Sequence, residues 1–200
     1  MTRDAASFEQ LYRDLVDPWD YETSAYEADK YQRSLQLLPR SRYGRGLEVG
    51  CSIGVMSTSI ARRCDCLLGI DFAPTAINRA KAREVENARF EVASVPEGWP
   101  PGSWDLIVLS EVLYYLEPDA LNRTIECVGR GLAPDGDCLI VSYTGPTETL
   151  LTSEEAGDRL LETVKRDREH HEIFSTSGPS WVATVFSSRH SKSSEVVGGI

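Results

Sequence analysis

Two carboxylates near a glycine-bearing turn are the side chains of this sequence best placed to bind a ligand. The stretch LEVGCSIG, residues 47–54, contains Glu48, Gly50 and Gly54, and Asp71 ends the next apolar segment. An apolar strand that turns through glycines into a helix presents free backbone N–H groups at the carboxyl edge of a sheet. There Glu48 could receive an amino group, and Asp71 could accept both hydroxyls of a ribose. The two acids therefore predict a ligand with a cationic amine and a ribose but no phosphate.

The glycine turn lacks the full fingerprint of a dinucleotide site. Ser52 stands where G-x-G-x-x-G has its middle glycine, and no third glycine follows at or near Thr58. S-adenosylmethionine (SAM) has an amine and a ribose but no phosphate, so it fits the two acids better than a nicotinamide cofactor does. The structural alternatives for the acids are a strand-end salt bridge and a helix N-cap. The functional alternatives are a nicotinamide oxidoreductase and a noncatalytic SAM-binding protein.

Glu111 is the candidate for the chemistry of methyl transfer. It follows the apolar segment WDLIVLS at 104–110, and Tyr114 and Tyr115 come soon after it. A sulfonium methyl is already activated, so the protein mainly aligns the acceptor and excludes water. An amine acceptor must lose a proton before it attacks, and a nearby carboxylate can bind the ammonium form and help to remove that proton. We expect one tyrosine to face the acceptor and the other to pack under the sheet; a solvated acid and ordinary core packing are the structural alternatives.

Apolar strands that alternate with helices must position these residues. The pattern predicts strands at 46–50, 66–71, 88–93, 104–110 and 138–143, and helices at 55–63, 74–86 and 118–131. Such alternation implies parallel pairing in a three-layer, Rossmann-like α/β sheet. A charged helix at 153–168 follows, and then two strands at 170–177 and 181–188 flank a Gly-Pro turn. These two strands predict an antiparallel pair at the C-terminal end.

Two helices upstream of the first strand could form a lid. Apolar spacing places them at Ala5–Val16 and Ala25–Leu38, on either side of the turn-like DPWDYETS. In this lid Trp19 and Tyr26 could cover bound ligands or simply pack the helices on the sheet. Lys30 could approach the methionine carboxylate of the cofactor, or be an exposed helical lysine. The expected organisation is one methyltransferase domain at 1–190, with a lid at 1–44, a catalytic core at 45–190 and a mobile tail at 191–200.

Composition and charge narrow the class of protein. Two hundred residues suit a single domain, and the formal net charge of −10 disfavours nucleic acid as a partner. We therefore expect a neutral or cationic substrate. The sequence has no apolar stretch near the roughly 20 residues of a membrane span and no signal-peptide pattern, so we expect a cytoplasmic protein with no membrane partner. Five scattered cysteines predict reduced thiols and no metal site, and His170, His171 and His190 are assigned no catalytic role.

Several motifs together resemble a known enzyme family. LEVGCSIG, GIDFAPTAINRAK, WDLIVLSEVLYYL and LAPDGDCLIVSY look like successive motifs of class I SAM-dependent methyltransferases, over Gly46–Tyr143. DPWDYETSAYEADKYQRSL and SEVLYYL resemble the NodS-like (nodulation protein S) group. That group includes an N-methyltransferase of chitooligosaccharides and methyltransferases associated with sugar deacetylases. The histidine-containing stretch common in the latter is missing from 142–168.

The resemblance implies a role for each matched residue. Glu48, Gly50, Cys51 and Gly54 would flank the methionine part of SAM, Asp71 would hold the ribose, Phe72 would pack beside the adenosine, Ala93 and Ser94 would line the adenine, and Ser110 and Glu111 would lie near the sulfur and the acceptor. It also implies N-methylation of a free amino group on an amino sugar or oligosaccharide, with S-adenosylhomocysteine (SAH) as product. A small-molecule O-methyltransferase is the alternative.

Overall fold

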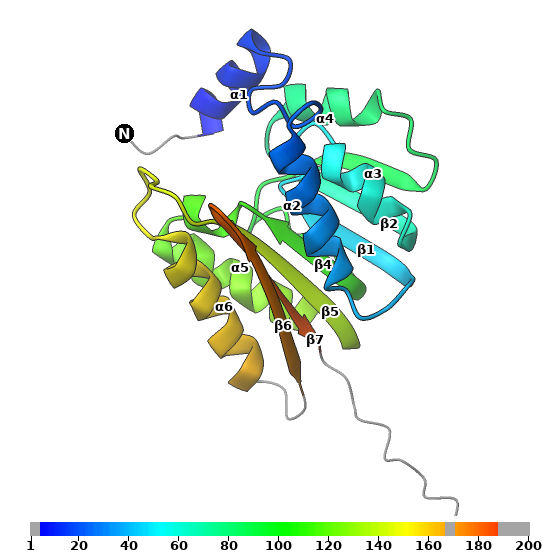
Figure 1. The fold of residues 1–200 in the computed structure, drawn as a ribbon, viewed down its shortest axis with the longest axis vertical. Coiled ribbons are helices and arrows are strands. Elements are labelled where there is room, and N and C mark those ends of the chain that lie inside the picture. The colour runs from blue at the N-terminus through cyan, green and yellow to red at the C-terminus, as the bar shows by residue number, and fades with distance from the viewer. Residues whose placement is uncertain (1–4, 167–170, 188–200) are drawn as a thin grey trace, which may run out of the picture.

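Seven strands form one sheet in this computed structural model, which describes residues 5–166 and 171–187. The order across the sheet is β3-β2-β1-β4-β5-β7-β6 (Figure 1). The strands are β1 Tyr43–Val49, β2 Cys64–Asp71, β3 Ala88–Val92, β4 Trp104–Ser110, β5 Leu132–Tyr143, β6 Glu172–Gly178 and β7 Trp181–Ser187. The first five strands pair in parallel, and β7 pairs antiparallel with both β5 and β6. The expected fold class, mostly parallel with an antiparallel pair at the end, is confirmed.

Helices cover both faces of this sheet. They are α1 Ala5–Asp14, α2 Ala25–Gln36, α3 Val55–Ala61, α4 Pro74–Lys81, α5 Pro118–Gly131 and α6 Ser153–Arg166, with a 3-10 turn η1 at Leu113–Tyr115. The helices lie on both sides of the sheet (Figure 1). Apolar residues of α2 and α3 join the core cluster of one face, and those of α5 and α6 join the core cluster of the other. The central strand β4 is therefore enclosed, and 106–109 are fully buried. This explains why its sequence is a continuous apolar run and not an alternating one.

Some element boundaries differ from the sequence pattern. The strand β1 begins at Tyr43, inside the range expected for the lid, and β5 begins at Leu132, six residues early. The helix α4 ends at Lys81 and not at residue 86, because Glu84 takes a left-handed backbone with φ 53°, which an α-helix cannot continue. The helix α3 ends at Ala61, two residues short of its expected end.

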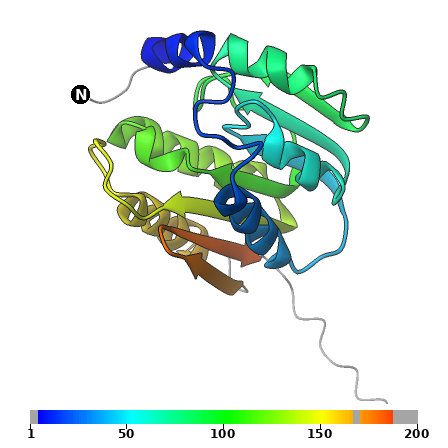
Figure 2. The same cartoon turned by 45° about the horizontal axis from the view of Figure 1, so that its top comes forward.

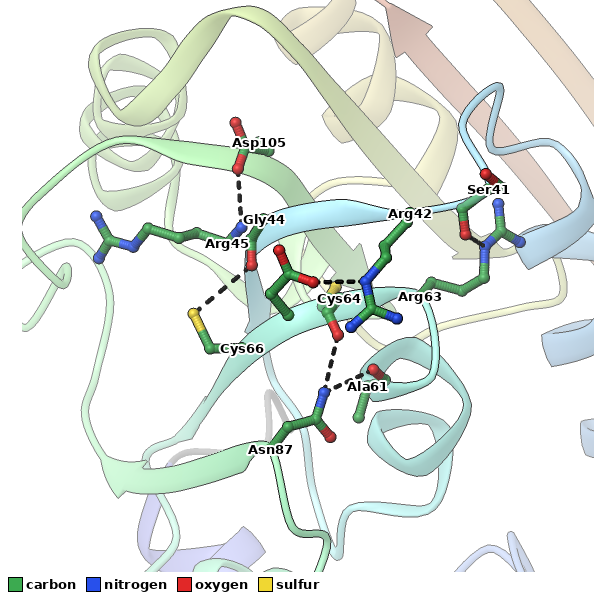
Figure 3. A network of polar contacts seen from close by, with 11 residues as sticks. Ser41, Arg42, Gly44, Arg45, Ala61, Arg63, Cys64, Cys66, Asn87 and Asp105 are labelled. Atoms are coloured by element: carbon green, nitrogen blue, oxygen red, sulfur yellow. Dashed lines mark hydrogen bonds and ion pairs between the residues drawn. The ribbon is translucent and has the colours of Figure 1, made fainter.

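Polar contacts tie the amino ends of the central strands together (Figure 3). The side-chain amide of Asn87 donates to the carbonyls of Ala61 and Cys64, both at 2.9 Å. It thus gives a hydrogen-bond partner to the last carbonyl of α3 and to the first carbonyl of β2. The backbone N–H of Arg45 donates to Asp105 at 2.8 Å, which links β1 to β4. These contacts hold the amino ends of strands whose carboxyl ends lie at the opposite edge of the sheet.

The helix α1 lies along α4, on the side where the parallel strands end (Figure 2). Glu9 accepts hydrogen bonds from the backbone and hydroxyl of Thr75, and Arg79 donates to the carbonyls of Leu15 and Val16. The helix α1 is thus attached to the sheet through α4, whereas α2 packs against α3, β6 and β7.

Several expectations fall beyond the described ranges or concern absences. The tail at 191–200, the domain end at 190, His170 and His190 lie outside the described residues. All five cysteines are free thiols. Within 5–166 and 171–187, no three metal-binding side chains come together and no helix has the length and apolar character to cross a membrane.

Candidate active site

The glycine turn between β1 and α3 has an unusual backbone. Gly50, Ser52 and Gly54 all take positive φ angles, of 77°, 50° and 79°. A Cβ at Gly50 would overlap Cγ2 of Val112, so glycine is required there for space as well as for conformation. The turn brings the backbone of β1 close to the residues that follow β4, at the shared carboxyl edge.

Ser52, the residue in the middle-glycine position, connects this turn to α1. Its hydroxyl lies 2.6 Å from the hydroxyl of Tyr12, and its backbone N–H donates to Asp71 at 3.0 Å. Serine tolerates the left-handed backbone less readily than glycine does. In return, the serine hydroxyl makes the hydrogen bond with Tyr12, which a glycine at this position would lack.

Glu48, near the end of β1, is 1% exposed. It accepts a hydrogen bond from Ser57, and among the described residues no cation pairs with it. Burial raises the pKa of Glu48 to about 8, against the lowering effect of the Ser57 hydrogen bond. The strand-end salt bridge is thus wrong for Glu48, and a buried carboxyl without a cation suits a ligand that brings its own ammonium group.

Asp71 holds the end of β2 against the turn. Its carboxylate accepts from the backbone N–H groups of Ser52 at 3.0 Å and Ala73 at 2.9 Å. Burial raises the pKa of Asp71 to about 6, although these backbone hydrogen bonds oppose the shift. Ala73 is the N-cap residue of α4, and Asp71 lies two residues before it and bonds its N–H, so Asp71 is not itself the N-cap. Its carboxylate is fixed in position and borders a cavity.

That cavity, termed the central cavity, has a volume of about 580 Å³ and lies over the carboxyl ends of β1, β2 and β4. It is lined by nine of the expected site residues: Trp19, Gly50, Asp71, Phe72, Ala93, Ser94, Ser110, Glu111 and Tyr115. Phe8 and Tyr12 of α1 also line it, and Phe8 packs edge-on against Phe72 with ring centroids 5.7 Å apart. The upstream segment therefore forms one wall of the central cavity.

A small cavity of about 30 Å³ adjoins the central cavity below the glycine turn. Glu48, Cys51, Lys30 and Glu111 line it, together with Tyr21. Gly50, Ser52, Ser110, Glu111 and Tyr21 line both cavities. Gly54 borders neither of them; it packs against Ala80 of α4 and serves the turn itself.

A third cavity, termed the side cavity, has a volume of about 410 Å³ and opens between α2 and the segment after β5. Its wall is aromatic and acidic: Trp19, Tyr26, Tyr114, Tyr115, Tyr143, Glu27, Glu111 and Glu148, with Lys30 as its one basic residue among those described. Of the described residues, only Glu111 lines the central, small and side cavities alike. Glu111 therefore stands at their junction.

The three catalytic candidates, Glu111, Tyr114 and Tyr115, all line the side cavity. The two tyrosines differ from our expectation. Tyr114 and Tyr115 both line the side cavity, whereas we expected only one of them to face the cleft. Tyr115 also lines the central cavity, and its ring meets Phe8 edge-on at 5.2 Å. Tyr114 is 3% exposed, and burial raises its pKa well above its ordinary value, so its phenol stays protonated. The centroids of the two rings lie 4.6 Å apart, and Tyr114 also belongs to the buried core, as expected for one of the pair.

Lys30 differs most from the sequence-based alternatives. It is 1% exposed, so the interpretation as an exposed lysine is wrong. Its Nζ donates to Glu27 Oε1 at 2.8 Å and to Glu111 Oε1 at 2.6 Å. Glu27 was missed from the sequence, where its only signal is the three-residue spacing that puts it on the same helix face as Lys30.

Comparison with known proteins bears on this site. The nodulation protein S (NodS) family model matches residues 4–148. Nodulation protein S of Sinorhizobium fredii is 36% identical over 136 residues, 65% of this chain and 63% of that protein's length. The Bradyrhizobium diazoefficiens protein of the same name is 33% identical over 141 residues, 68% of this chain and 67% of its own length. The matched part is thus less than two thirds of the first of these relatives.

The fold of this chain is also similar to that of a solved structure. The N-methyltransferase NodS of Bradyrhizobium japonicum WM9, in complex with SAH, superimposes with a TM-score of 0.74 at 26% identity. The alignment covers 90% of this chain and 97% of that one. The family match includes the glycine turn, both buried acids and Glu111. The chain belongs to the nodulation protein S family.

Proposed function

We propose that this protein is a SAM-dependent methyltransferase that methylates a free amino group of an amino sugar or oligosaccharide. The observation that carries the proposal is the position of Glu111 between the central cavity and an acidic, aromatic side cavity. The relatives named nodulation protein S and the SAH-bound NodS structure support a SAM cofactor and an N-methyl product.

The central and small cavities fit SAM by the chemistry of their walls. Glu48, buried without a cation, would receive the amino group, and Asp71 would accept the ribose hydroxyls. Trp19 and Phe8 would exclude water from above, and Ala93 would line the adenine. When bound, SAM supplies a methyl group that is already electrophilic.

The side cavity fits an acceptor with a cationic amine and a sugar ring. Aromatic faces suit both a sugar and an ammonium group, and the carboxylates outnumber the one lysine. The neutral amine uses its lone pair to form the new N–C bond. At the same time the S–C bond breaks, and the electron pair of that bond stays on sulfur. Glu111 holds the ammonium form in line and takes the proton that the nitrogen loses.

The test is transfer of labelled methyl from SAM to paired acceptors. Glucosamine and deacetylated chitooligosaccharides should be labelled on nitrogen, whereas their N-acetylated counterparts, which lack the free amine, should not. Mass spectrometry of the product locates the methyl group. Labelling of simple phenols without labelling of any amino sugar would overturn the acceptor assignment in favour of O-methylation.

A binding experiment separates the cofactor from the acceptor. SAM and SAH should raise the melting temperature of the protein, because a ligand that binds the folded state stabilises it. NADH should leave the melting temperature unchanged. Stabilisation by NADH and not by SAM would overturn the cofactor assignment whatever the acceptor.

A further inference from the structure

The contact between Lys30 and Glu111 joins two segments that are 81 residues apart in the chain. Lys30 projects from α2, and Glu111 follows β4 with a left-handed backbone, φ 54°. The backbone N–H of Glu111 donates to the carbonyl of Val141 at 2.8 Å, which fixes its main chain to β5. A non-glycine residue in this conformation costs free energy, and such residues gather at functional sites. Glu111 is thus fixed at its backbone by Val141 and at its carboxylate by Lys30.

The surroundings of the Lys30 ammonium are those of a cation-binding site. Two carboxylates bond it, and the rings of Tyr26 and Tyr31 lie 5.5 and 5.6 Å from Nζ. Burial alone would lower the pKa of Lys30, but the ion pair with Glu111 and the hydrogen bonds to both acids raise it above its ordinary value. Lys30 therefore remains charged at neutral pH.

The charges of this cluster do not cancel. Glu27 and Glu111 carry one negative charge each and Lys30 one positive charge, which leaves a net charge of −1 on the wall of the side cavity. Glu27 is 7% exposed, so solvent screens it little. An ammonium group that entered the side cavity would bring the cluster to neutrality.

We propose that Lys30 is a positioning residue for methyl transfer: its ammonium fixes the carboxylate of Glu111 at the junction of the three cavities and, shared with Glu27, leaves one negative charge for a cationic acceptor. This inference rests on the proposed function and extends it to two residues on α2. Lys30 acts through Glu111 and does not itself touch the reacting atoms.

The competing role for Lys30 is to bind the methionine carboxylate of SAM, because Lys30 also lines the small cavity. The geometry favours the positioning role, since Nζ is already bonded to two carboxylates at 2.8 and 2.6 Å. A third carboxylate would have to share an ammonium group whose three N–H bonds are mostly in use.

Lys30→Met separates the two roles, because methionine keeps the length of the side chain and removes its charge. The positioning role predicts that kcat falls about 10- to 100-fold, while the affinity for SAH changes less than about twofold. Lys30→Arg should restore part of kcat. Lys165→Met on α6 is the matched control and should leave both quantities unchanged, because Lys165 is exposed and lines none of the three cavities.

The pH profile gives a readout that a merely structural role would not move. Several titratable groups line the small and side cavities together with Glu111. They are Lys30, Glu27, Glu48, Glu148, Cys51 and the phenols of Tyr21, Tyr26, Tyr31, Tyr114, Tyr115 and Tyr143. A carboxylate that loses its cation partner is protonated more readily, so the acid limb of the kcat profile should move to higher pH in Lys30→Met. Loss of SAH affinity with an unchanged kcat at saturating SAM would overturn the proposal.

Glu27→Gln tests the charge argument and serves as the second variant should Lys30→Met fail to fold. It removes the surplus negative charge but leaves Lys30 bonded to Glu111. KM for the amine acceptor should rise about 5- to 10-fold, with a smaller change in kcat. An unchanged KM would contradict the assignment of the surplus charge to the acceptor.

Nuclear magnetic resonance of the lysine ammonium groups in the SAH complex tests the contact without any acceptor. The Lys30 signal should disappear in Lys30→Met and shift in Glu111→Gln. An unchanged chemical shift of the Lys30 signal in Glu111→Gln would overturn this inference but leave the proposed function standing. Failure of the wild-type protein to methylate any amine would instead overturn the proposed function.

Discussion

Two buried acids at this site have pKa values that reach into the neutral range, and the cause is burial in both. Glu48 rises to about 8 and Asp71 to about 6, the latter held down by two backbone N–H groups. The acid without backbone donors is the one proposed to receive an ammonium group. The surroundings of each acid, and not its residue type, thus distinguish their roles.

SAH binding should release a proton near pH 7. Glu48 is mostly protonated below pH 8 and must ionise to pair with the amino group of the ligand, so the affinity should rise with pH by up to about tenfold per unit below that value. Calorimetry in two buffers of different ionisation enthalpy measures the released proton. Glu48→Gln should bind more weakly and with no proton exchange; the same proton release in that variant would count against Glu48.

Replacement of Asp71 should weaken SAM binding. Asp71→Ala removes the proposed acceptor of the ribose hydroxyls and should lower the affinity for SAH by about 10- to 100-fold, which corresponds to about 1.4–2.8 kcal/mol. Because Asp71 also bonds the N–H groups of Ser52 and Ala73, Asp71→Asn is the control that keeps one acceptor oxygen. Equilibrium dialysis with labelled SAH measures both variants, and unchanged affinity in Asp71→Ala would refute the ribose role.

At the scale of elements, α1 forms one wall of the central cavity and packs along α4. Its polar links are the Tyr12–Ser52 hydrogen bond and the bonds of Glu9 with Thr75 on α4, and Phe8 adds ring contacts with Phe72 and Tyr115. The serine in the middle of the glycine turn is therefore coupled to the upstream helix. A glycine there would relieve the backbone but lose this bond.

Tyr12→Phe and Ser52→Gly should have the same effect on α1 because each removes the same hydrogen bond. We expect each to destabilise the docked position of residues 5–14 by about 1 kcal/mol. Hydrogen exchange of this segment in the SAH complex measures the change. The double variant should add little to either single variant; fully additive effects would show that the two residues act independently.

At the scale of the whole molecule, the sheet order brings acids from β1, β2 and the segment after β4 to a single edge. The free energy of unfolding of the ligand-free protein should therefore depend on pH through these buried acids. A carboxyl group whose pKa is raised by folding stabilises the folded state fully below its unfolded pKa, and that contribution is lost as pH rises through the folded value.

The ligand-free protein should therefore lose stability relative to Glu48→Gln as the pH rises from about 5 to above 8. The window follows from the ordinary value of 4.5 and the raised value of about 8 for Glu48. Thermal melts across this range compare the two proteins, and saturating SAH should narrow the difference in the wild type because it supplies the missing cation. Parallel pH dependence in the two ligand-free proteins would contradict this account.

The sequence by itself determined the fold class and most of the central cavity. Apolar runs bounded by turns place the strands, parallel strands bring their carboxyl ends to one edge, and residues that follow those ends must meet there. Glu48, Asp71, Ser94 and Glu111 are each found beside a cavity for that reason. Local patterns failed mainly at element ends, as at α4, which ends at Lys81 before the left-handed backbone of Glu84, a conformation that apolar spacing does not reveal.

Only the tertiary structure decided what Lys30 does. On α2 it looks like an ordinary helical lysine, and the partner that buries it, Glu111, lies 81 residues away. The same holds for Tyr12 and Ser52, which are 40 residues apart. Periodicity reports which face of a helix is apolar, but a buried polar contact depends on which helix packs over which strand end. The sequence thus located the acids that we propose to bind the cofactor, and the packing of α2 determined the charge on the wall of the side cavity.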